Sequence, residues 1–276
     1  MVDKIEFILN LLEESSFSVE SKAPFLRAFI GALDASNTSR LLIHSISHNL
    51  YLRDLINRKI EFDIKDGKGL LYEDLASKLL HIAKTSKYSV ALSALISLSF
   101  LFSSLKTNTQ LSILYFLTNS DRVVFRRKAY KLMLEHYHDD YKNILMQSWQ
   151  SYQEIECCRL MIEQLDAISL LQFRHDLCNK CNAGWLISKL YIKLGKAHPE
   201  LLSELRHINS DAYCYCLWIL NLKLPSVSAG EPGELIDKSH EQSFLIWCLG
   251  RLAEWDLIMD VFNLSNLAPQ DISSPT

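Results

Sequence analysis

Apolar residues recur at intervals of three and four along most of the chain, a spacing that places them on one face of an α-helix. In residues 2–14 this pattern predicts an amphipathic helix whose apolar face is formed by Ile5, Ile8, Leu9 and Leu12. We expect a second helix to begin at Pro24, because the first position of a helix needs no backbone N–H donor. A third helix is expected from about Thr38 to Asn57. The charged, glycine-containing segment 61–69 then predicts a loop.

From residue 69 onward the predicted helices come in pairs. Residues 70–84 and 88–105 form the first pair, with a turn between them. Comparable positions near the start of each second helix recur every 28 to 34 residues, at Val90, Val124, Ile155, Ala183, Tyr213 and Gln242. A period of this length is typical of repeats that are built from two helices. Possible capping boxes at Ser151–Glu154 and Ser239–Gln242 agree with helix starts at two of these positions.

Residues 114–134 show the repeat pattern most clearly. An apolar stripe ends at Leu117, and the polar run 118–121 predicts a turn. The next stripe has the form V-x-R-x-x-A-x-x-L and comprises Val124, Arg126, Ala129 and Leu132. This combination resembles a HEAT repeat. Degenerate versions of it cover residues 69–264, although the arginine is absent after Val90 and in the last two repeats.

The resemblance implies an all-α fold, a right-handed α-solenoid of antiparallel helix pairs (HEAT-like repeats) that forms a curved single domain. Each pair in such a fold has apolar faces that only the neighbouring pairs can cover. We therefore predict irregular N-terminal cap helices over residues 1–68, regular repeats over 69–224, a loop over 225–233, a C-terminal cap repeat over 234–266 and a disordered tail over 267–276.

The composition supports a folded helical protein and limits its partners. Of the 276 residues, 49% are hydrophobic and 22% are charged, so the chain can bury a substantial core. The 8 glycines and 6 prolines are fewer than a turn-rich β fold requires. The formal net charge of -3 supplies no overall positive field, which argues against nucleic acid as a partner.

Residues 88–105 contain no charged side chain, so a membrane span is one interpretation of this segment. Its length is at the lower limit for crossing a bilayer, and Ser89, Ser93 and Ser97 would form a polar strip along it. A helix buried among neighbouring repeats explains the same composition, and we expect no membrane span. The N-terminus lacks the pattern of a signal peptide. Seven scattered cysteines are typical of reduced thiols, so we predict a cytoplasmic protein.

The sequence offers few candidates for catalytic or metal chemistry. His175, Cys178 and Cys181 recur at helical spacing, but structural zinc takes four ligands and no second pair has suitable spacing. His44 and His48 lack the glutamate of a metalloprotease helix. The sequence contains neither a glycine-rich phosphate loop nor a nucleophile with an evident base. We therefore predict no metal, no cofactor and no catalytic residue.

The densest basic group lies between residues 122 and 131 and is the main candidate for partner binding. Its members are Arg122, Arg126, Arg127, Lys128 and Lys131. They would form a ridge that contacts an acidic protein or a phosphate chain; alternatively, an arginine pairs with an acid of a neighbouring repeat, or the face is solvated. Large aromatic residues gather in the C-terminal half, and exposed ones would anchor a partner. We select as partner-binding residues Arg122, Arg126, Arg127, Lys131 and Tyr215.

The HEAT-like resemblance implies a curved helical surface that binds a protein, and we expect a non-catalytic adaptor, inhibitor or immunity-type partner. The sequence does not identify the bound protein. One alternative is a nucleic-acid-binding HEAT-like protein of the alkylated-base DNA glycosylase type, which Trp255 and Asp256 resemble only loosely. A second alternative is a HEAT-like bilin lyase, which no residue pattern in this chain favours.

Overall fold

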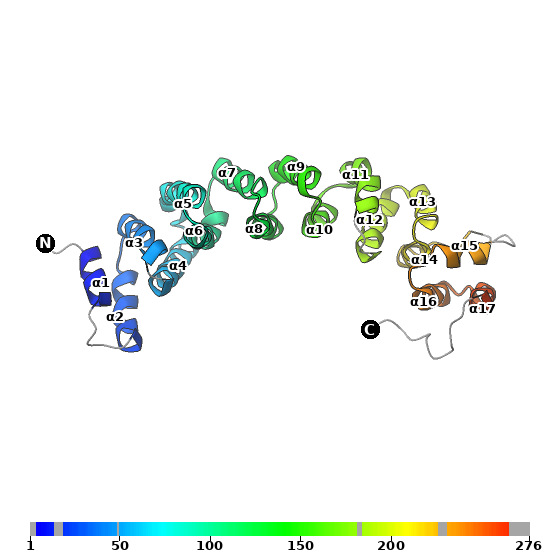
Figure 1. Cartoon of the computed structure of the whole chain (residues 1–276), viewed down its shortest axis with the longest axis horizontal. Coiled ribbons are helices and arrows are strands. Elements are labelled where there is room, and N and C mark those ends of the chain that lie inside the picture. The colour runs from blue at the N-terminus through cyan, green and yellow to red at the C-terminus, as the bar shows by residue number, and fades with distance from the viewer. Residues whose placement is uncertain (1–3, 14–18, 49, 181–183, 226–230, 265–276) are drawn as a thin grey trace. The chain divides into compact units, whose positions relative to one another are not determined.

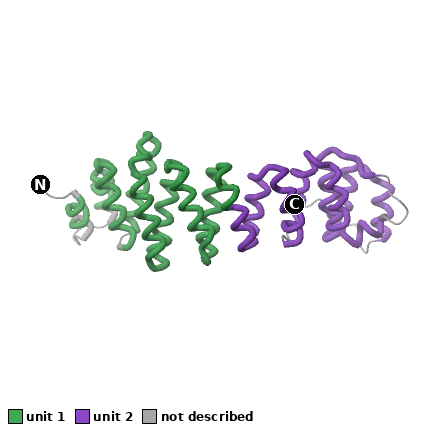
Figure 2. Tube along the Cα trace, turned by 90° about the horizontal axis from the view of Figure 1, so that it is seen from above, with its two compact units in different colours: residues 1–144 green, residues 145–276 purple. Residues whose placement is uncertain are grey.

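In the computed structural model, residues 4–13, 19–48, 50–180, 184–225 and 231–264 are described. Within these ranges the chain forms 17 α-helices and short 3-10 helices and contains no β-strand, which confirms the all-α prediction. The chain divides into two compact units, residues 1–144 and 145–276 (Figure 2). The more extensive contacts between helices join helices of the same unit.

Unit 1 is built from helices that pack against their neighbours in the chain. These are α1 (Lys4–Glu13), α2 (Val19–Gly31), α3 (Ala35–His48), α4 (Leu50–Lys65), α5 (Glu73–Thr85), α6 (Tyr88–Leu101), α7 (Thr107–Thr118) and α8 (Val123–Glu135), with 3-10 helices η1 (Gly69–Tyr72), η2 (Phe102–Ser104) and η3 (Asp139–Tyr141). Packing joins α3 with α4, α5 with α6 and α7 with α8, and further contacts join α2 with α4, α4 with α6 and α5 with α7. Within this unit, α5 and α7 lie in one row and α6 and α8 in another (Figure 1).

Most of α9 (Lys142–Tyr152) belongs to unit 2, because this helix begins only three residues before the division between the units. The further helices of unit 2 are α10 (Ile155–Gln164), α11 (Ala167–Lys180), α12 (Gly184–Ala197), α13 (Leu202–Arg206), α14 (Ser210–Ile219), α15 (Glu231–Asp237), α16 (Gln242–Leu252) and α17 (Trp255–Leu264), with the 3-10 helix η4 (Pro199–Leu201) before α13. Contacts connect α10, α12, α14 and α16 in succession. Helix α11 packs against α10 and α12, α13 packs against α12 and α14, and α17 packs against α15 and α16.

Helix α6 shows how the sequence pattern produces a buried helix. Its buried positions include small residues on several sides, among them Ala91, Ser93, Ala94 and Ser97, so α4 and α5 can both pack closely against it. Ser93 Oγ accepts a hydrogen bond from Arg53 Nη1 at 2.9 Å. Because α6 has only 14 residues, it is too short to cross a bilayer, and none of the described helices is long and apolar enough to do so.

A buried carboxylate from α14 accepts hydrogen bonds from backbone N–H groups immediately before α16. Asp211 Oδ2 accepts hydrogen bonds from the N–H groups of His240 and Glu241, at 2.8 and 2.9 Å, and Ser239 Oγ donates to Asp211 Oδ1 at 2.6 Å. Burial raises the pKa of Asp211, and these three hydrogen bonds oppose that rise. Asp211 therefore acts as a helix cap supplied from 28 to 30 residues earlier in the chain.

Both predicted capping boxes are wrong. The residue before α16 is Glu241 rather than Ser239, and its side chain makes no capping bond. Ser151 lies inside α9, and Glu154 precedes α10 without a capping bond. Local spacing located these helix starts closely but assigned the capping groups incorrectly.

The predicted loop at residues 61–69 is mostly helical, because α4 continues to Lys65. Ion pairs one helical turn apart, Lys59–Asp63 and Lys65–Glu61, stabilise this last part of α4. The turn itself contains Gly67 at φ +78°, a backbone conformation that favours glycine. Gly69 then packs so closely that an added Cβ would lie 2.4 Å from Ser104 Cβ.

Other predicted boundaries in the described residues also shift. The expected helix 38–57 is two helices, since α3 ends at His48 and α4 begins at Leu50. Pro24 lies inside α2 rather than at its first position. At the expected loop 225–233, residues 231–233 already belong to α15. The expected tail, residues 267–276, lies outside the described residues.

The positions used to mark the sequence period lie near helix starts. Val124, Ile155, Tyr213 and Gln242 fall within the first four residues of α8, α10, α14 and α16, and Val90 is the third residue of α6. Ala183 lies outside the described residues. Helices α6, α8, α10, α14 and α16 therefore begin close to the positions that the sequence period marks.

Candidate protein-binding surfaces

Arg122, the first of the predicted partner-binding residues, is already engaged with aromatic rings of unit 1. It occupies the position before α8, and its guanidinium carbon lies 5.1 Å from the ring centre of Tyr88 and 5.3 Å from that of Phe125. The two rings are nearly parallel, with centres 6.1 Å apart. Arg122 thus contributes a cation–π contact that joins the beginnings of α6 and α8.

Arg126 serves the turn between α7 and α8. Its side chain is only 6% exposed, and Nη1 donates a hydrogen bond to the Ser120 carbonyl oxygen at 2.6 Å. This bond connects α8 to the polar turn that precedes it. The geometry gives Arg126 a positioning role within unit 1.

A groove of about 220 Å³ lies between α6 and α8, and the remaining basic residues line it. Its apolar lining consists of Leu92, Leu95, Ile96, Val124 and Phe125. Its cationic lining consists of Arg127, Lys128 and Lys131. The structure therefore brings two of the predicted residues, Arg127 and Lys131, to one apolar surface together with Lys128. The residues of α6 were missed, although Leu92 and Ile96 have the i, i+4 spacing of one helix face.

Electrostatic repulsion is evident in this groove, which we call the α6–α8 groove. The pKa of Lys128 is lowered by burial first and by the charge of Lys131 second, while Glu135 partly offsets both effects. Lys131 Nζ lies 3.7 Å from Glu135 Oε1, but both side chains are largely exposed, so solvent weakens this pair. An anionic group placed in the groove would relieve the cost of charging Lys128.

Tyr215 belongs to a cluster of half-exposed aromatic rings in unit 2. Its ring centre lies 5.7 Å from that of Trp218 on α14 and 5.8 Å from that of Phe244 on α16. Trp218 and Trp247 are 5.2 Å apart edge to face, and Phe244 and Trp247 are stacked 5.7 Å apart. Arg251 lies 5.0 Å from the ring centre of Trp247 and 5.5 Å from that of Trp218.

We call Tyr215, Trp218, Phe244, Trp247 and Arg251 the aromatic cluster. Only Tyr215 was selected from the sequence. The spacing of Phe244, Trp247 and Arg251 on α16 places them along one face, but their partners on α14 are far away in the sequence. Aromatic rings that keep part of their surface exposed are typical of binding hot spots.

The residues considered for metal binding and those considered for the DNA glycosylase alternative lie in different parts of the described chain. Within the described residues, no group of three His, Cys, Asp or Glu side chains could hold a metal ion, and Cys181 lies outside those residues. The six described cysteines are buried and form no disulfide. Burial raises the pKa of the Cys214 and Cys216 thiols to about 12. Trp255 and Asp256 are exposed neighbours in the first turn of α17.

Comparison with known proteins adds no family to this geometry. No protein-family model, curated protein or solved structure matches the chain. The case for a function consequently depends on the surfaces described above.

Proposed function

We propose that this chain is a non-catalytic protein-binding module of the cytoplasm, an adaptor, inhibitor or immunity-type partner. In this proposal its helix pairs are HEAT-like repeats that stack as a right-handed α-solenoid, and the second helices present the binding surface. The pairing of α5 with α6 and α7 with α8, and the succession of α10, α12, α14 and α16, support such stacking.

The α6–α8 groove is the observation that carries the proposal. Leu92 and Ile96 are partly exposed and Val124 is 47% exposed, whereas Leu95 and Phe125 are buried beneath them, and three cations of α8 lie alongside. Burying the apolar surface against a partner is favourable, and an acidic residue of that partner would be attracted by Lys128 and Lys131. The groove is thus suited to a protein surface that combines apolar and acidic side chains.

The aromatic cluster supports protein binding independently in unit 2. Its four rings already contact one another, so little side-chain entropy is lost when a partner covers them. Tyr and Trp side chains of this kind supply much of the binding free energy at protein interfaces. Neither surface contains a described nucleophile paired with a base, and both fit binding better than catalysis.

The test is a quantitative comparison of captured proteins. Full-length chain immobilised on beads is exposed to a lysate of its source cells, and bound proteins are quantified by mass spectrometry. Wild-type chain should retain one protein at near-stoichiometric amount, and Lys128→Glu/Lys131→Glu should retain about tenfold less of it, because two attractive charges become repulsive. The matched control Lys78→Glu/Lys142→Glu changes the net charge equally and should retain the wild-type amount.

Two results would contradict the proposal. One is an unchanged capture profile in the charge-reversed groove variant, with no loss after Trp247→Ala either. The other is recovery of nucleic acid in place of a protein, with a binding constant that depends steeply on salt.

A further inference from the structure

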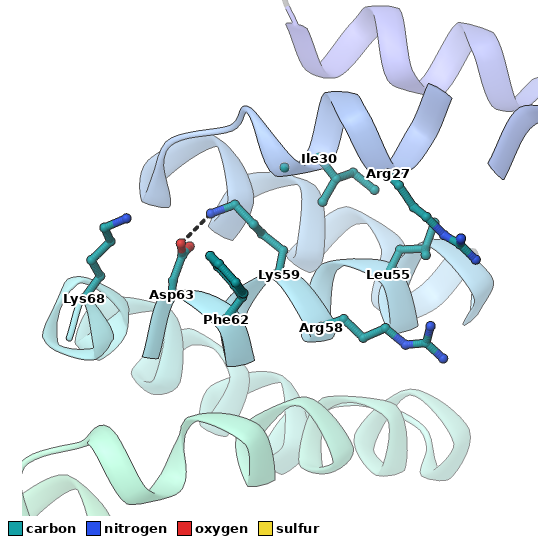
Figure 3. Close-up of a pocket in the computed structure, with 9 residues that line it drawn as sticks. Arg27, Ile30, Leu55, Arg58, Lys59, Phe62, Asp63 and Lys68 are labelled. Carbon is teal, nitrogen blue, oxygen red and sulfur yellow. Dashed lines mark hydrogen bonds and ion pairs between the residues drawn. The ribbon is translucent and has the colours of Figure 1, made fainter. Parts of the chain in front are cut away.

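A second cationic pocket lies within unit 1, between α2 and α4, far along the chain from the basic helix α8. Its volume is about 530 Å³, which is within the range of sites that bind ligands or peptide side chains. Figure 3 shows residues from α2 and α4 on its walls and Lys68, just beyond α4, at one end. None of these residues was among those selected from the sequence.

Two arginines give this pocket its charge. Arg27 comes from α2 and Arg58 from α4, and Figure 3 shows both guanidinium groups at the same end of the pocket. Both side chains are exposed, and neither makes a hydrogen bond or ion pair within the described residues. This end of the pocket therefore carries two positive charges that no acid in the described part of the chain neutralises.

The opposite end is close to neutral. Asp63 accepts hydrogen bonds from Lys59 Nζ and from the Tyr72 hydroxyl, so its charge is compensated inside unit 1. Burial, followed by the hydrogen bond to Asp63, raises the pKa of Tyr72, which keeps this hydroxyl protonated as a donor. Lys68 lies 3.5 Å from Asp66 in an exposed ion pair. The attraction for an anion is consequently concentrated at the arginine end.

Between the two ends the pocket is apolar. Ile30 and Leu55 are buried beneath it, and the Phe62 side chain beside them remains 61% exposed. A large exposed ring beside aliphatic side chains is unfavourable to hydrate and makes a favourable contact with another apolar side chain. A ligand that fits all parts of the pocket must therefore combine an apolar group with anionic groups.

We infer that this pocket docks a linear acidic segment of a partner protein, with an apolar side chain against Phe62 and carboxylates beside Arg27 and Arg58. The inference depends on the proposed protein-binding function and deepens it by stating the partner's chemistry. A peptide fits better than a nucleic acid, because the base of the pocket is formed by aliphatic side chains and only two of its cations are not paired with an acidic side chain. A phosphate chain carries a charge at every nucleotide and would need more cations. Arginine also forms two parallel hydrogen bonds with a carboxylate, which adds direction to the attraction.

The experiment uses the full chain and a positional-scanning library of fluorescein-labelled octapeptides, with binding measured by fluorescence polarisation. Wild-type chain should select Asp or Glu near Leu, Ile, Phe or Met. The best selected peptide should bind Arg27→Gln/Arg58→Gln about tenfold more weakly, since two charge-assisted contacts are lost. Arg27→Lys/Arg58→Lys should keep part of the affinity, and Phe62→Ala should reduce it about fivefold through lost apolar contact.

The matched control is Lys65→Gln/Lys78→Gln, which removes two exposed cations that do not line the pocket. This variant should bind the selected peptide as wild type does. The inference is overturned if the library shows no acidic preference, or if the arginine variant binds as tightly as the control. It is also overturned if an oligothymidylate of eight nucleotides binds more tightly than the peptide and its affinity is unchanged by Phe62→Ala.

Failure here is distinguishable from failure of the proposed function. Peptide binding to the α2–α4 pocket should survive Lys128→Glu/Lys131→Glu, because those lysines line a different groove. If no acidic peptide is selected while the α6–α8 groove still captures a protein, only the assignment of this pocket is lost.

Discussion

The α6–α8 groove of unit 1 and the aromatic cluster of unit 2 are each formed between two alternate helices of the chain, yet they differ in how closely those helices approach. Helices α14 and α16 pack directly against each other, whereas α6 and α8 contact each other much less. Close approach in unit 2 brings rings from both helices into contact, and wider separation in unit 1 leaves a groove lined by long cations. The spacing between neighbouring helices thus determines whether the surface is aromatic and filled or cationic and hollow.

Asp211 on α14 binds the segment just before α16, so removing this carboxylate should have the largest effect. Asp211→Ala leaves the Ser239 hydroxyl and the N–H groups of His240 and Glu241 without their acceptor. We expect a loss of about 3 kcal/mol in the free energy of unfolding, because three part-buried hydrogen bonds to one buried carboxylate are lost together. Chemical denaturation followed by circular dichroism measures this loss.

The control for that prediction is Asp256→Ala, an exposed acid in the first turn of α17, which should change stability by less than about 0.5 kcal/mol. Equal stability of the two variants would show that Asp211 does not hold α14 and α16 together. Asp211→Asn should be intermediate, since its amide oxygen can still accept some of the hydrogen bonds.

The second prediction separates the two surfaces by their response to salt. Trp247→Ala should weaken binding of the captured partner about 30-fold, or about 2 kcal/mol, because Trp247 contacts Trp218, Phe244 and Arg251 at the centre of the cluster. The loss should persist at about 0.5 M salt, whereas the effect of reversing Lys128 and Lys131 should shrink there. Isothermal titration calorimetry at two salt concentrations measures both.

Trp255→Ala is the matched control, since Trp255 is 67% exposed and makes no ring contact with the cluster. A partner affinity that falls equally in both tryptophan variants would show that the cluster has no special role. A loss at Trp247 that disappears at high salt would contradict the distinction between the two surfaces.

The smallest expected effect concerns the charge of Lys128. Because its pKa is lowered by burial and by Lys131, the charged form costs stability at neutral pH. Lys128→Met should therefore stabilise unit 1 by about 0.5 kcal/mol, a modest amount because the side chain is partly exposed and screened. Thermal unfolding at low salt measures the difference.

The pH dependence of that difference follows from the direction of the shift. The pKa of Lys128 in the folded chain lies below its unfolded value of 10.5, so between these two values the unfolded chain binds more protons. The stability of the wild-type chain should therefore rise relative to Lys128→Met as pH increases through this interval. A constant difference across the interval would mean that Lys128 does not titrate with a lowered pKa.

The candidate sites show which of their parts sequence can reveal. The basic group on α8 was visible because its members are neighbours on one helix, and the structure places Arg127 and Lys131 in one groove. The burial of Arg126 was not visible, because it depends on a bond to the carbonyl of Ser120 in the preceding turn. The pocket of Arg27 and Arg58 was missed because those residues come from different helices and share no sequence motif.

The helical content and the approximate starts of α6, α8, α10, α14 and α16 were determined by local sequence, since apolar spacing, small residues and turn residues act over a few positions of the chain. Capping of α16 by Asp211, the aromatic contacts between α14 and α16, and the separation of α6 from α8 were decided only in the folded chain. These features depend on which residues meet across long stretches of sequence, and the depth to which each side chain is buried sets its charge and its freedom to bind.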